Sequence, residues 1–425
     1  MTDPSESGPP APAAPGADVR PAAMRFILIA VLIDMLSIGL IVPVLPPLVG
    51  TFTDDASQRA FWYGAVTFAF SIASFFAAPV LGALSDRYGR RPVLLLGFCG
   101  LALSFFVTAL ADALWMLIVV RLFAGAVQAN AAVANAYVAD ITAPEQRGKR
   151  FGQLGAMFGI GFMIGPVMGG LLGSIDLHLP FFVAGTLALL NLAYGVMVLP
   201  ESLPRERRKP VRWASANPIA ALAQLGQNRG IGPLVVVIAL ANLAQFTLYT
   251  TWVLYTTYRF DWGPRDNGFS LLAVGVASTL VQGVLLPRLL RRFGAERLAV
   301  MGLVSGSLAF LFWGLATQGW MMYAVIACNL LGFAVAASIQ SIVSNAVDAR
   351  SQGSTMGATA SLASLMAVLA PVLGAPLMGA VSHLPPADWR VGAPMYFCAA
   401  LQAAAFIVAA WHFGRLRRAA PHATG

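Results

Sequence analysis

Two charged residues stand inside long apolar stretches of this 425-residue sequence, and they are the first candidates for chemistry. Asp34 lies about eight residues into an apolar run that begins near Phe26. A charged side chain in hydrocarbon costs at least about 2.5–3.5 kcal/mol, so such residues usually face a cavity and serve a function. Because a carboxyl group shielded from water can bind and release a proton near neutral pH, we expect Asp34 to bind a proton or a ligand. A structural hydrogen bond to a neighbouring helix is the alternative.

Arg121 is the one basic residue inside an apolar run, and it needs an acceptor group or a wet cavity for the same energetic reason. Asp34 stands about a third of the way through its run from one end, whereas Arg121 stands nearer the opposite end of its own run. A direct ion pair between them is therefore not expected. We predict a coupling role for Arg121, with packing or anchoring as the alternative.

Amide side chains interrupt several apolar runs. Inside lipid an amide normally bonds another helix or lines a cavity. Taken singly, each amide is more typical of a helix-to-helix contact, but together they predict cavity walls in the fourth, seventh, eighth and tenth runs. The amides are Gln128, Asn130, Asn135, Asn242, Gln245, Gln282, Asn329, Gln340 and Asn345.

An aromatic stripe follows the seventh apolar run at spacings of three or four residues, which places its members on one helix face. It consists of Phe246, Tyr249, Trp252 and Tyr255. Such a stripe can stack on a flat aromatic ligand, so Tyr249 joins the cavity candidates. An aromatic belt at the membrane interface is the alternative, and it is favoured from Trp252 onward.

The elements that position these residues follow from the composition. Hydrophobic residues make up 58% of the chain and charged residues 11%, with a mean hydropathy of +0.74. Soluble chains carry about a quarter charged residues, so the composition excludes a soluble enzyme, a disordered protein and a nucleic-acid binder. The runs are continuous rather than alternating, which argues against a membrane barrel. Because no catalytic constellation, phosphate loop or metal-ligand cluster is visible, we expect neither an enzyme nor a cofactor.

The apolar runs number twelve, and each is about long enough to cross a ~30 Å hydrocarbon layer. We therefore predict an all-α multi-pass membrane protein with 12 transmembrane helices. The runs are 26–50, 61–84, 92–111, 113–139, 150–174, 179–199, 231–258, 267–290, 297–316, 319–345, 354–382 and 391–413.

The basic residues predict the orientation. With both termini in the cytoplasm, 22 of the 27 Lys and Arg residues fall on the cytoplasmic side, 4 fall outside and 1 lies within a span. Basic residues stay on the cytoplasmic side of inserted helices, so a bias of this size fixes the orientation. We expect a multi-pass protein of the cell inner membrane.

Five segments organise the chain: a disordered tail (1–23), a six-helix bundle (24–199), a cytoplasmic linker (200–230) with a short surface helix around 217–225, a second bundle (231–414) and a tail (415–425). The bundles repeat. Gly89 and Gly294 lie 205 positions apart, and the same offset relates Pro166 to Pro371 and Gly169 to Gly374. Two pseudo-symmetric six-helix halves are typical of alternating-access transporters, with the substrate site between them.

The connection between the second and third runs carries the most specific motif. It reads Gly82-Ala-Leu-Ser-Asp86-Arg87-Tyr-Gly89-Arg90-Arg91. Asp86 is an acid among three arginines at a helix end, where it can pair with them or face the positive end of a neighbouring helix. Such a cluster can hold the two halves in one state and release them in the other. A plain positively charged loop is the alternative.

This motif resembles the signature loop of the major facilitator superfamily. Arg121 is similar in position to that family's intramembrane arginine, and the fifth run resembles its antiporter motif. The residues that carry the second likeness are Gly161, Gly165, Pro166, Gly169 and Gly170. The glycines permit close helix packing and Pro166 bends the run. The family likeness implies that this bend blocks proton leak.

Within the superfamily, the stretches 34–46, 85–96, 113–117, 151–156 and 252–262 look most like the tetracycline/proton antiporters. Three positions depart from that pattern. The acids of the third and ninth spans in those antiporters match Ser104 and Gly306 here, and their histidine at the outer end of the seventh span matches Asp261. The likeness therefore does not secure tetracycline as the substrate or the same proton route.

The resemblance implies a proton-coupled antiporter that exports tetracycline or a related small amphipathic drug by alternating access. Its expected partners are the small-molecule substrate, protons and the lipid bilayer, with no nucleic acid, and the chain is expected to be a monomer. A carrier for a sugar, lipid or other metabolite is the alternative, favoured by the absent acids. A membrane-embedded enzyme or channel would need clustered catalytic groups or an unbroken polar pore, and the sequence has neither.

Overall fold

The computed structural model describes residues 21–210, 217–227, 232–345 and 352–419. Within these ranges the chain folds into helices, and no strand occurs among them. The predicted all-α multi-pass fold is confirmed. Residues 1–20 of the predicted tail (1–23) and parts of the linker at 211–216 and 228–230 lie outside the described residues. The tail prediction is wrong at 21–23, because these residues form the start of the first helix.

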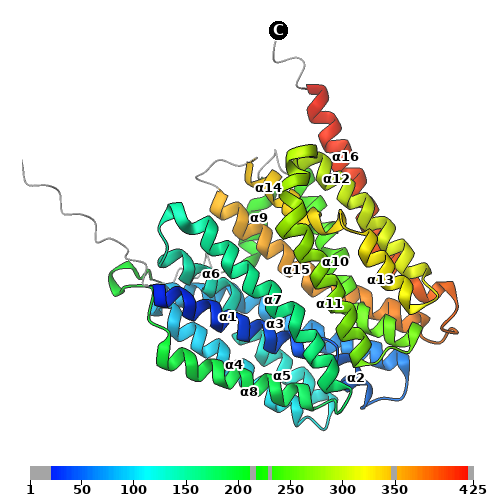
Figure 1. The fold of residues 1–425 in the computed structure, drawn as a ribbon, viewed down its shortest axis with the longest axis horizontal. Coiled ribbons are helices and arrows are strands. Elements are labelled where there is room, and N and C mark those ends of the chain that lie inside the picture. Colours follow the sequence, from blue (N-terminus) through cyan, green and yellow to red (C-terminus); the bar gives the residue numbers. More distant parts are fainter. Residues whose placement is uncertain (1–20, 211–216, 228–231, 346–351, 420–425) are drawn as a thin grey trace, which may run out of the picture.

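The N-terminal half comprises the first eight α-helices, shown from blue to green in Figure 1. They are α1 (Pro21–Ile41), α2 (Leu45–Gly50), α3 (Ala56–Tyr88), α4 (Arg90–Ala109), α5 (Leu114–Val127), α6 (Asn130–Asp140), α7 (Arg147–Gly173) and α8 (Leu179–Val198), with the short turn η1 (Pro144–Gln146) before α7.

A short helical turn, η2 (Arg205–Arg207), and the helix α9 (Pro218–Gln227) lie in the linker. The predicted surface helix around 217–225 is therefore present.

The C-terminal half lies beside the N-terminal half (Figure 1). Its elements are α10 (Gly232–Phe260), α11 (Pro264–Leu280), the π-helical turn η3 (Val281–Leu285), α12 (Leu286–Leu315), α13 (Gly319–Cys328), η4 (Gly332–Ala334), α14 (Val335–Asn345), α15 (Gln352–Val381), η5 (Trp389–Gly392) and α16 (Ala393–Ala419). The last helix continues past the predicted bundle end at 414.

Ten helical segments among the described residues are long and apolar enough to cross a membrane, or eleven if the bent pair α13 and α14 counts as one span. One of the ten, Pro264–Leu315, has 52 residues, or about 78 Å at 1.5 Å per residue, which is far more than one crossing needs. The helical backbone breaks within it at Gly294. Two crossings in that segment would bring the total to twelve, which stays a prediction.

Gly89 and Gly294 are the only glycines with positive φ in the described part of the chain, at 110° and 75°. Glycine adopts this conformation without steric penalty because it lacks a Cβ. Their ψ values are also alike, 161° and 162°, so the two positions related by the 205-residue offset make similar turns. The internal repeat seen in the sequence thus has a counterpart in the backbone.

Three predicted spans are not continuous helices. The first is interrupted at residues 42–44, between α1 and α2, and the fourth at Gln128 and Ala129, between α5 and α6. The tenth is broken between α13 and η4, and its two parts meet at 55°. Next to the break in the fourth span α3 passes very close: the backbone carbonyl of Phe70 and the side chain of Ala73 lie against Gly125. Broken helices expose backbone groups that can line a binding cavity.

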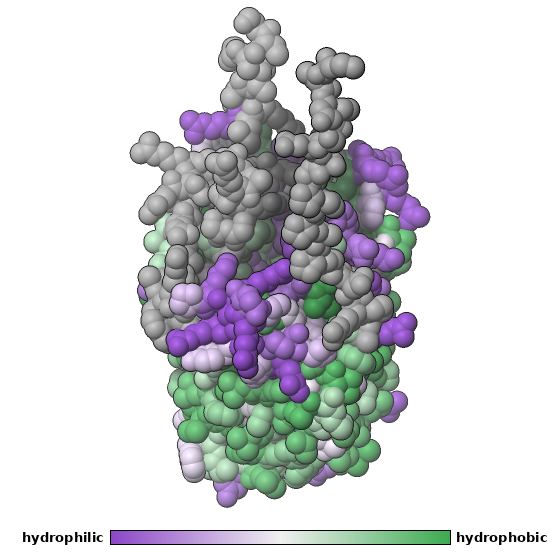
Figure 2. Space-filling view, turned by 90° about the vertical axis from the view of Figure 1, so that its left-hand side faces the viewer, coloured by the Kyte–Doolittle hydropathy of each residue, from purple (hydrophilic) through white to green (hydrophobic). Residues whose placement is uncertain are grey.

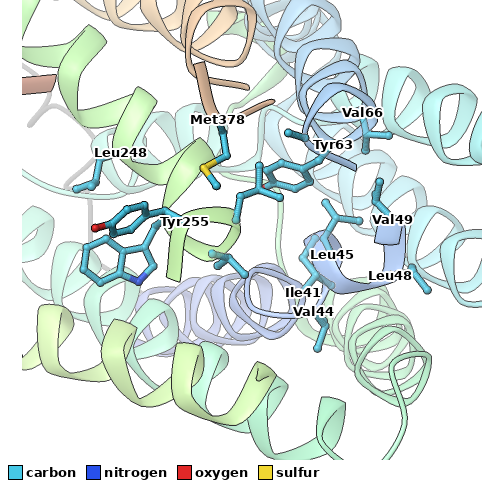
Figure 3. Packing of buried hydrophobic residues seen from close by; sticks show 14 of the residues in the cluster. Ile41, Val44, Leu45, Leu48, Val49, Tyr63, Val66, Leu248, Tyr255 and Met378 are labelled. Atoms are coloured by element: carbon cyan, nitrogen blue, oxygen red, sulfur yellow. The ribbon is translucent and has the colours of Figure 1, made fainter. Parts of the chain in front are cut away.

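The halves join through two helix pairs, α3 with α15 and α7 with α11. We call the end that carries the α3–α4 connection and the linker the basic end, and the opposite end the far end. One apolar core crosses between the halves at the far end, with Tyr63, Leu248, Tyr255 and Met378 among its members (Figure 3). Toward the basic end each half has a separate core, one around Leu94 and one around Leu303.

The outer surface fits a hydrocarbon environment. Large apolar side chains lie exposed on many helices, such as Met197 at 77% and Ile407 at 64%. Figure 2 shows a broad apolar band below a cluster of polar side chains. In water, contiguous apolar surface of this extent is rare on a folded chain. The protein is therefore a multi-pass membrane protein.

Candidate functional site

A cavity of about 400 Å³ lies between the two halves and is called here the central cavity. Residues of α1, α3, α4 and α5 line it from one half, and residues of α10, α11, α12 and α16 from the other. Ten aromatic rings form much of its wall: Tyr63, Phe70, Phe105, Phe162, Phe246, Tyr249, Trp252, Phe310, Trp313 and Phe333. This size and lining suit a small apolar molecule with a few polar groups.

Arg121 is the only charged residue among those that line the central cavity. The residue is 7% exposed, and its Nε and Nη2 atoms are buried without a hydrogen-bond partner among the described residues. Gln128, Gln245 and Asn329 also line the cavity, as do hydroxyl side chains such as Thr67, so the polar part of its wall is mostly uncharged. The wall can therefore offer hydrogen bonds from amides and hydroxyls and one positive charge.

Asp34 lies in α1 and is 3% exposed. The Nδ2 atom of Asn130 donates a hydrogen bond to its Oδ1 atom over 2.9 Å, and Asn130 itself is 4% exposed. Neither residue is among those that line the central cavity. No salt bridge joins Asp34 to Arg121 in the described part of the chain. The structure thus places the predicted carboxylate and arginine in separate surroundings.

Local packing positions this pair. The break before α6 puts Asn130 at the start of that helix. Gly97 of α4 lies directly against the Asn130 amide, where any side chain would collide with it. One turn earlier on α1, the Asn191 amide donates to the carbonyl of Ala30 over 2.9 Å.

The glycines of the fifth predicted span seat α1 against α7. A Cβ added to Gly161 would lie 2.6 Å from the Met35 Cβ, and one added to Gly165 would lie 2.7 Å from the Gly39 Cα. Gly169 lies against the carbonyl of Leu40 in the same way. These three glycines of α7 therefore allow close packing against α1, the helix that carries Asp34.

Gly170 and the backbone carbonyl of Pro166 contact the opposite half. A Cβ added to Gly170 would lie 2.5 Å from the carbonyl oxygen of Pro264, in α11. Gly268 of the same helix lies against the carbonyl of Pro166. The antiporter-like motif thus packs on one side against its own half and on the other side against the opposite half.

A second hollow of about 470 Å³, the vestibule, adjoins the central cavity and shares Gln245, Tyr249 and Gln402 with it. Asn242, Gln282 and Gln340 also line the vestibule, and no charged residue is among its lining. These three predicted candidates therefore come together with Gln245 and Tyr249.

Asn135 does not join them. It is exposed, and its amide donates to the carbonyl of Ala131 in its own helix over 2.8 Å. The side chain of Asn345 lies outside the described residues.

Ion pairs and hydrogen bonds connect the charged residues at the α3–α4 connection to one another and to nearby acids. Arg90 Nη1 lies 2.5 Å from Asp86 Oδ1, and Arg90 Nε lies 3.0 Å from Oδ2 of Asp140 in α6. The carboxylate of Glu201, at the start of the linker, accepts hydrogen bonds from the backbone N–H groups of Arg90 (2.8 Å) and Arg91 (3.3 Å). It thereby caps α4 with a negative charge, which is the favourable sign at a helix N-terminus.

Arg87 of the same motif lies over the ring of Tyr88, 5.2 Å from its centroid, and does not enter the cluster among the described contacts. The contacts of the cluster lie within the N-terminal half and the linker.

Glycines along the two interhalf helix pairs reveal how the gap between the halves varies. At the far end, a Cβ added to Gly64 of α3 would lie 2.5 Å from the Ala375 Cβ of α15. Toward the basic end of the same pair, no described atom lies within 4 Å of such a Cβ at Gly82 or Gly357. The α7–α11 pair repeats this pattern, tight at Gly170 and open at Gly155 of α7 and at Gly283 of η3, which follows α11. The halves are packed together at the far end and separated toward the basic end.

Comparison with known proteins identifies the family. The model of the Major Facilitator Superfamily matches residues 27–371. The chain belongs to the major facilitator superfamily. The class C tetracycline resistance protein of Escherichia coli is 35% identical over 375 residues, covering 88% of this chain and 94% of that protein. The class B protein of Escherichia coli is 32% identical over 384 residues, covering 88% and 93%.

Solved structures agree on the fold. A crystal structure of the nucleoside transporter NupG superposes with a TM-score of 0.76 at 13% identity, covering 92% of this chain and 100% of that one. The family model and the tetracycline resistance proteins confirm the predicted membership of the superfamily, close to the tetracycline antiporters. The family is one of transporters, not enzymes. Among the residues that the structure describes, no group of three or more His, Cys, Asp or Glu could hold a metal ion.

In this facilitator-superfamily transporter, Ser104 and Gly306 both line the central cavity. The Ser104 hydroxyl is buried without a described partner, and a Cβ added to Gly306 would lie 2.8 Å from the Gln402 Nε2. The third departure, Asp261, lies at the far end with a positive φ of 56°. It lines a separate hollow of about 450 Å³, the far-end pocket, together with Arg59.

The membrane-belt alternative is wrong for Trp252 and Tyr255. They are 3% and 0% exposed, and the Trp252 indole N–H donates to the Ser270 hydroxyl over 3.0 Å. The Tyr255 hydroxyl donates to the backbone carbonyl of Trp313 over 2.7 Å. Both side chains face other helices of the bundle rather than lipid.

Sequence reasoning missed several cavity residues, among them Tyr63, Trp313 and Gln402. Gln402 carried a usable signal, because it is an amide inside the last apolar run. The two aromatic residues carried none, since aromatic residues are common throughout these spans.

Proposed function

We propose that this transporter is a proton-coupled antiporter that exports tetracycline or a related small amphipathic drug by alternating access. The observation that carries the proposal is the central cavity: an aromatic pocket of about 400 Å³ between the halves, closed off at the far end by their packing. The similarity over most of the chain to proteins named for tetracycline resistance supports the substrate class.

Asp34 is the proposed proton carrier. Its carboxyl is buried on α1, one of the helices that line the central cavity, and Asn130 holds it at a helix break. α1 is also the helix that the α7 glycines grip at Gly161 and Gly165. Protonation of Asp34 removes a buried charge and so changes the free energy of this packed helix. In the proposed cycle Asp34 takes a proton from outside, which favours drug release and the return step.

The proposed orientation places the basic end in the cytoplasm of a prokaryotic inner membrane, with the termini on that side. The large excess of basic residues in the loops of that side supports this orientation. The described conformation, packed at the far end and separated toward the basic end, then faces the cytoplasm, where a drug would enter.

The charged cluster of Asp86, Arg87, Arg90 and Arg91 is the proposed cytoplasmic gate. In the described conformation Arg90 pairs with both Asp86 and Asp140. Arg121 is a proposed coupling residue, and Gln128, Gln245 and Tyr249 are proposed substrate contacts because they line the central cavity.

Drug uptake into inverted membrane vesicles tests the proposal. Tetracycline accumulation is expected to rise on imposing a pH gradient that is acidic inside, and to vanish when the gradient is collapsed. Asp34→Asn is expected to abolish the gradient dependence. Full-rate uptake by Asp34→Asn with unchanged gradient dependence would show that the assignment of Asp34 is wrong.

A metabolite carrier is the second candidate, and the observation that favours it is the replacement of the antiporter acids by Ser104 and Gly306 inside the cavity. A susceptibility profile with and without expression, in a host that lacks its own pumps, separates the two. Protection against tetracycline or other drugs supports export, and its absence together with thermal stabilisation by a sugar, lipid or metabolite supports the carrier.

A further inference from the structure

The residues that line the central cavity and the adjoining vestibule carry one positive charge and no negative charge. Arg121 contributes the only charge among the residues that line the central cavity, and the vestibule adds none. No carboxylate faces either space among the lining residues. A molecule in the central cavity therefore meets one positive group and no negative one.

The positive group is also unsatisfied. Arg121 is 7% exposed, and its Nε and Nη2 atoms have no hydrogen-bond partner among the described residues. The buried Asp34 carboxylate accepts its hydrogen bond from Asn130 and makes no salt bridge with Arg121 in the described part of the chain. Two buried guanidinium nitrogens without partners are costly, and an anionic ligand beside the group compensates its charge.

The geometry of the group specifies its partner. A guanidinium presents N–H donors in a planar fork that matches the two oxygens of a carboxylate or of an enolate flanked by a carbonyl. A cationic ligand would instead meet a like charge in a space where no lining acid compensates it, which disfavours binding. Ser104 and Gly306 also line the cavity and add no negative charge to it.

The uncharged residues that line the central cavity indicate the shape and polarity of the rest of the ligand. Aromatic rings from both halves, including Tyr249 and Phe310, line the cavity and can stack on a flat ring system. Amides such as Gln245 and Gln402 can bond hydroxyl or carbonyl groups at its edge.

We propose that the central cavity selects fused-ring aromatic substrates bearing an anionic oxygen group, and that Arg121 pairs with that group. The proposal rests on the proposed function only in taking this cavity as the substrate site. It narrows the substrate class to anions and zwitterions whose negative oxygens can reach Arg121.

Binding of three matched probes to the full-length protein in detergent tests this selection: anthracene-2-carboxylate, anthracene-2-carboxamide and 2-(aminomethyl)anthracene. They share one ring system and differ in charge at a single substituent. The carboxylate is expected to bind about 10- to 100-fold more tightly than the carboxamide, because a hydrogen bond to a charged group contributes more than a neutral one. The ammonium probe is expected to bind more weakly than the carboxamide.

Variants locate the selection. Arg121→Gln is expected to bring the carboxylate and the carboxamide to within about threefold, and Arg121→Lys to keep a reduced preference because an ammonium is a point charge rather than a fork. Arg59→Gln is the matched control. Arg59 also has a buried Nε without a described partner but lines the far-end pocket, so this variant keeps the wild-type preference.

Equal binding of the carboxylate and carboxamide by the wild-type protein would overturn the proposal, as would failure of the carboxylate to bind or an unchanged preference in Arg121→Gln. If Arg121→Gln does not fold, the wild-type comparison and Arg121→Lys decide the question. Binding is measured without a proton gradient. Vesicles that show no gradient-driven uptake would thus refute proton-coupled antiport and leave this charge preference standing.

Discussion

Adding one methyl group at Gly170 is expected to open the far end of the transporter. Gly170 of α7 packs against α11, and its Cβ in Gly170→Ala would lie 2.5 Å from the carbonyl oxygen of Pro264 and 3.2 Å from the Cα of Gly268. An ordinary contact begins at 3.4 Å, so the helices must separate by about 0.9 Å (3.4 − 2.5). The obstructing atoms are backbone and cannot rotate away.

Overpacking of this kind costs about 1–3 kcal/mol. Because α7 and α11 belong to opposite halves, the cost falls on conformations in which the far end is closed. The equilibrium between closed and open far ends is then expected to shift about 5- to 150-fold toward opening.

A cysteine at a buried far-end position reports this shift. Met378 is 2% exposed and lines the far-end pocket between the halves, so Met378→Cys is introduced after the native cysteines are replaced by serine. Its reaction rate with a membrane-impermeant maleimide, applied from the far-end side of sealed vesicles, is expected to rise when Gly170→Ala is added. Gly155→Ala is the control, because it adds the same methyl group to the same helix where no described atom lies within 4 Å. An unchanged or slower rate in Gly170→Ala, or an equal rise in Gly155→Ala, would refute the reasoning.

Two further predictions concern buried and exposed polar pairs. Asn130→Ala leaves the Asp34 carboxyl without its described donor, so the free energy of unfolding in detergent is expected to fall by about 1–3 kcal/mol, and drug transport is expected to fall with it. Asn135→Ala is the control and is expected to change neither, because its amide bonds only its own helix. Equal loss in both variants would contradict this. The Arg390 side-chain hydrogen bond lowers the pKa of the Asp388 carboxyl from 3.8 to about 2. The stabilising contribution of this ion pair is therefore present above about pH 4 and lost as the pH falls toward 2. Arg390→Gln is expected to lower the melting temperature by a constant amount from about pH 7 to 5, and by less below about pH 4. A difference in melting temperature that does not depend on pH would contradict a role for the pair.

Much of the fold was predictable from local features of the sequence. Length and apolarity of the runs were sufficient for an all-helical membrane protein, because a ~30 Å apolar layer admits few other solutions. The glycine pair Gly89 and Gly294 was readable because a tight turn between helices demands glycine at a fixed place in each half. The same reasoning found the close-packed face of α7 from Gly161 to Gly170.

The helix breaks were not readable, because they depend on contacts between distant segments. The apolar run through Gln128 continues without proline, and the backbone of α3 that crowds Gly125 comes from about 50 residues earlier. The break nevertheless decides where Asn130 meets Asp34. Local periodicity assigns residues to a helix face, but it does not say which neighbour covers that face.

In the cavity, too, some features were predictable from the local sequence and others depend on contacts between helices. The energetic cost of Arg121 in lipid predicted a wet or polar surrounding, and the residue does line the central cavity. The position of Trp252 along the seventh span predicts a place at the membrane interface, whereas its indole N–H bonds Ser270 of the next helix. That contact is set by how α10 and α11 pack, which no single run of residues records.

The most direct test of the coupling between drug and proton is proton movement driven by the drug alone. The purified protein is reconstituted into proteoliposomes with no pH gradient, a tetracycline gradient is imposed, and internal pH is followed with a trapped dye. The account predicts proton movement opposite to the drug in the wild-type protein and none in Asp34→Asn. Drug movement without any proton movement in the wild-type protein, or an equal proton signal in Asp34→Asn, would contradict it.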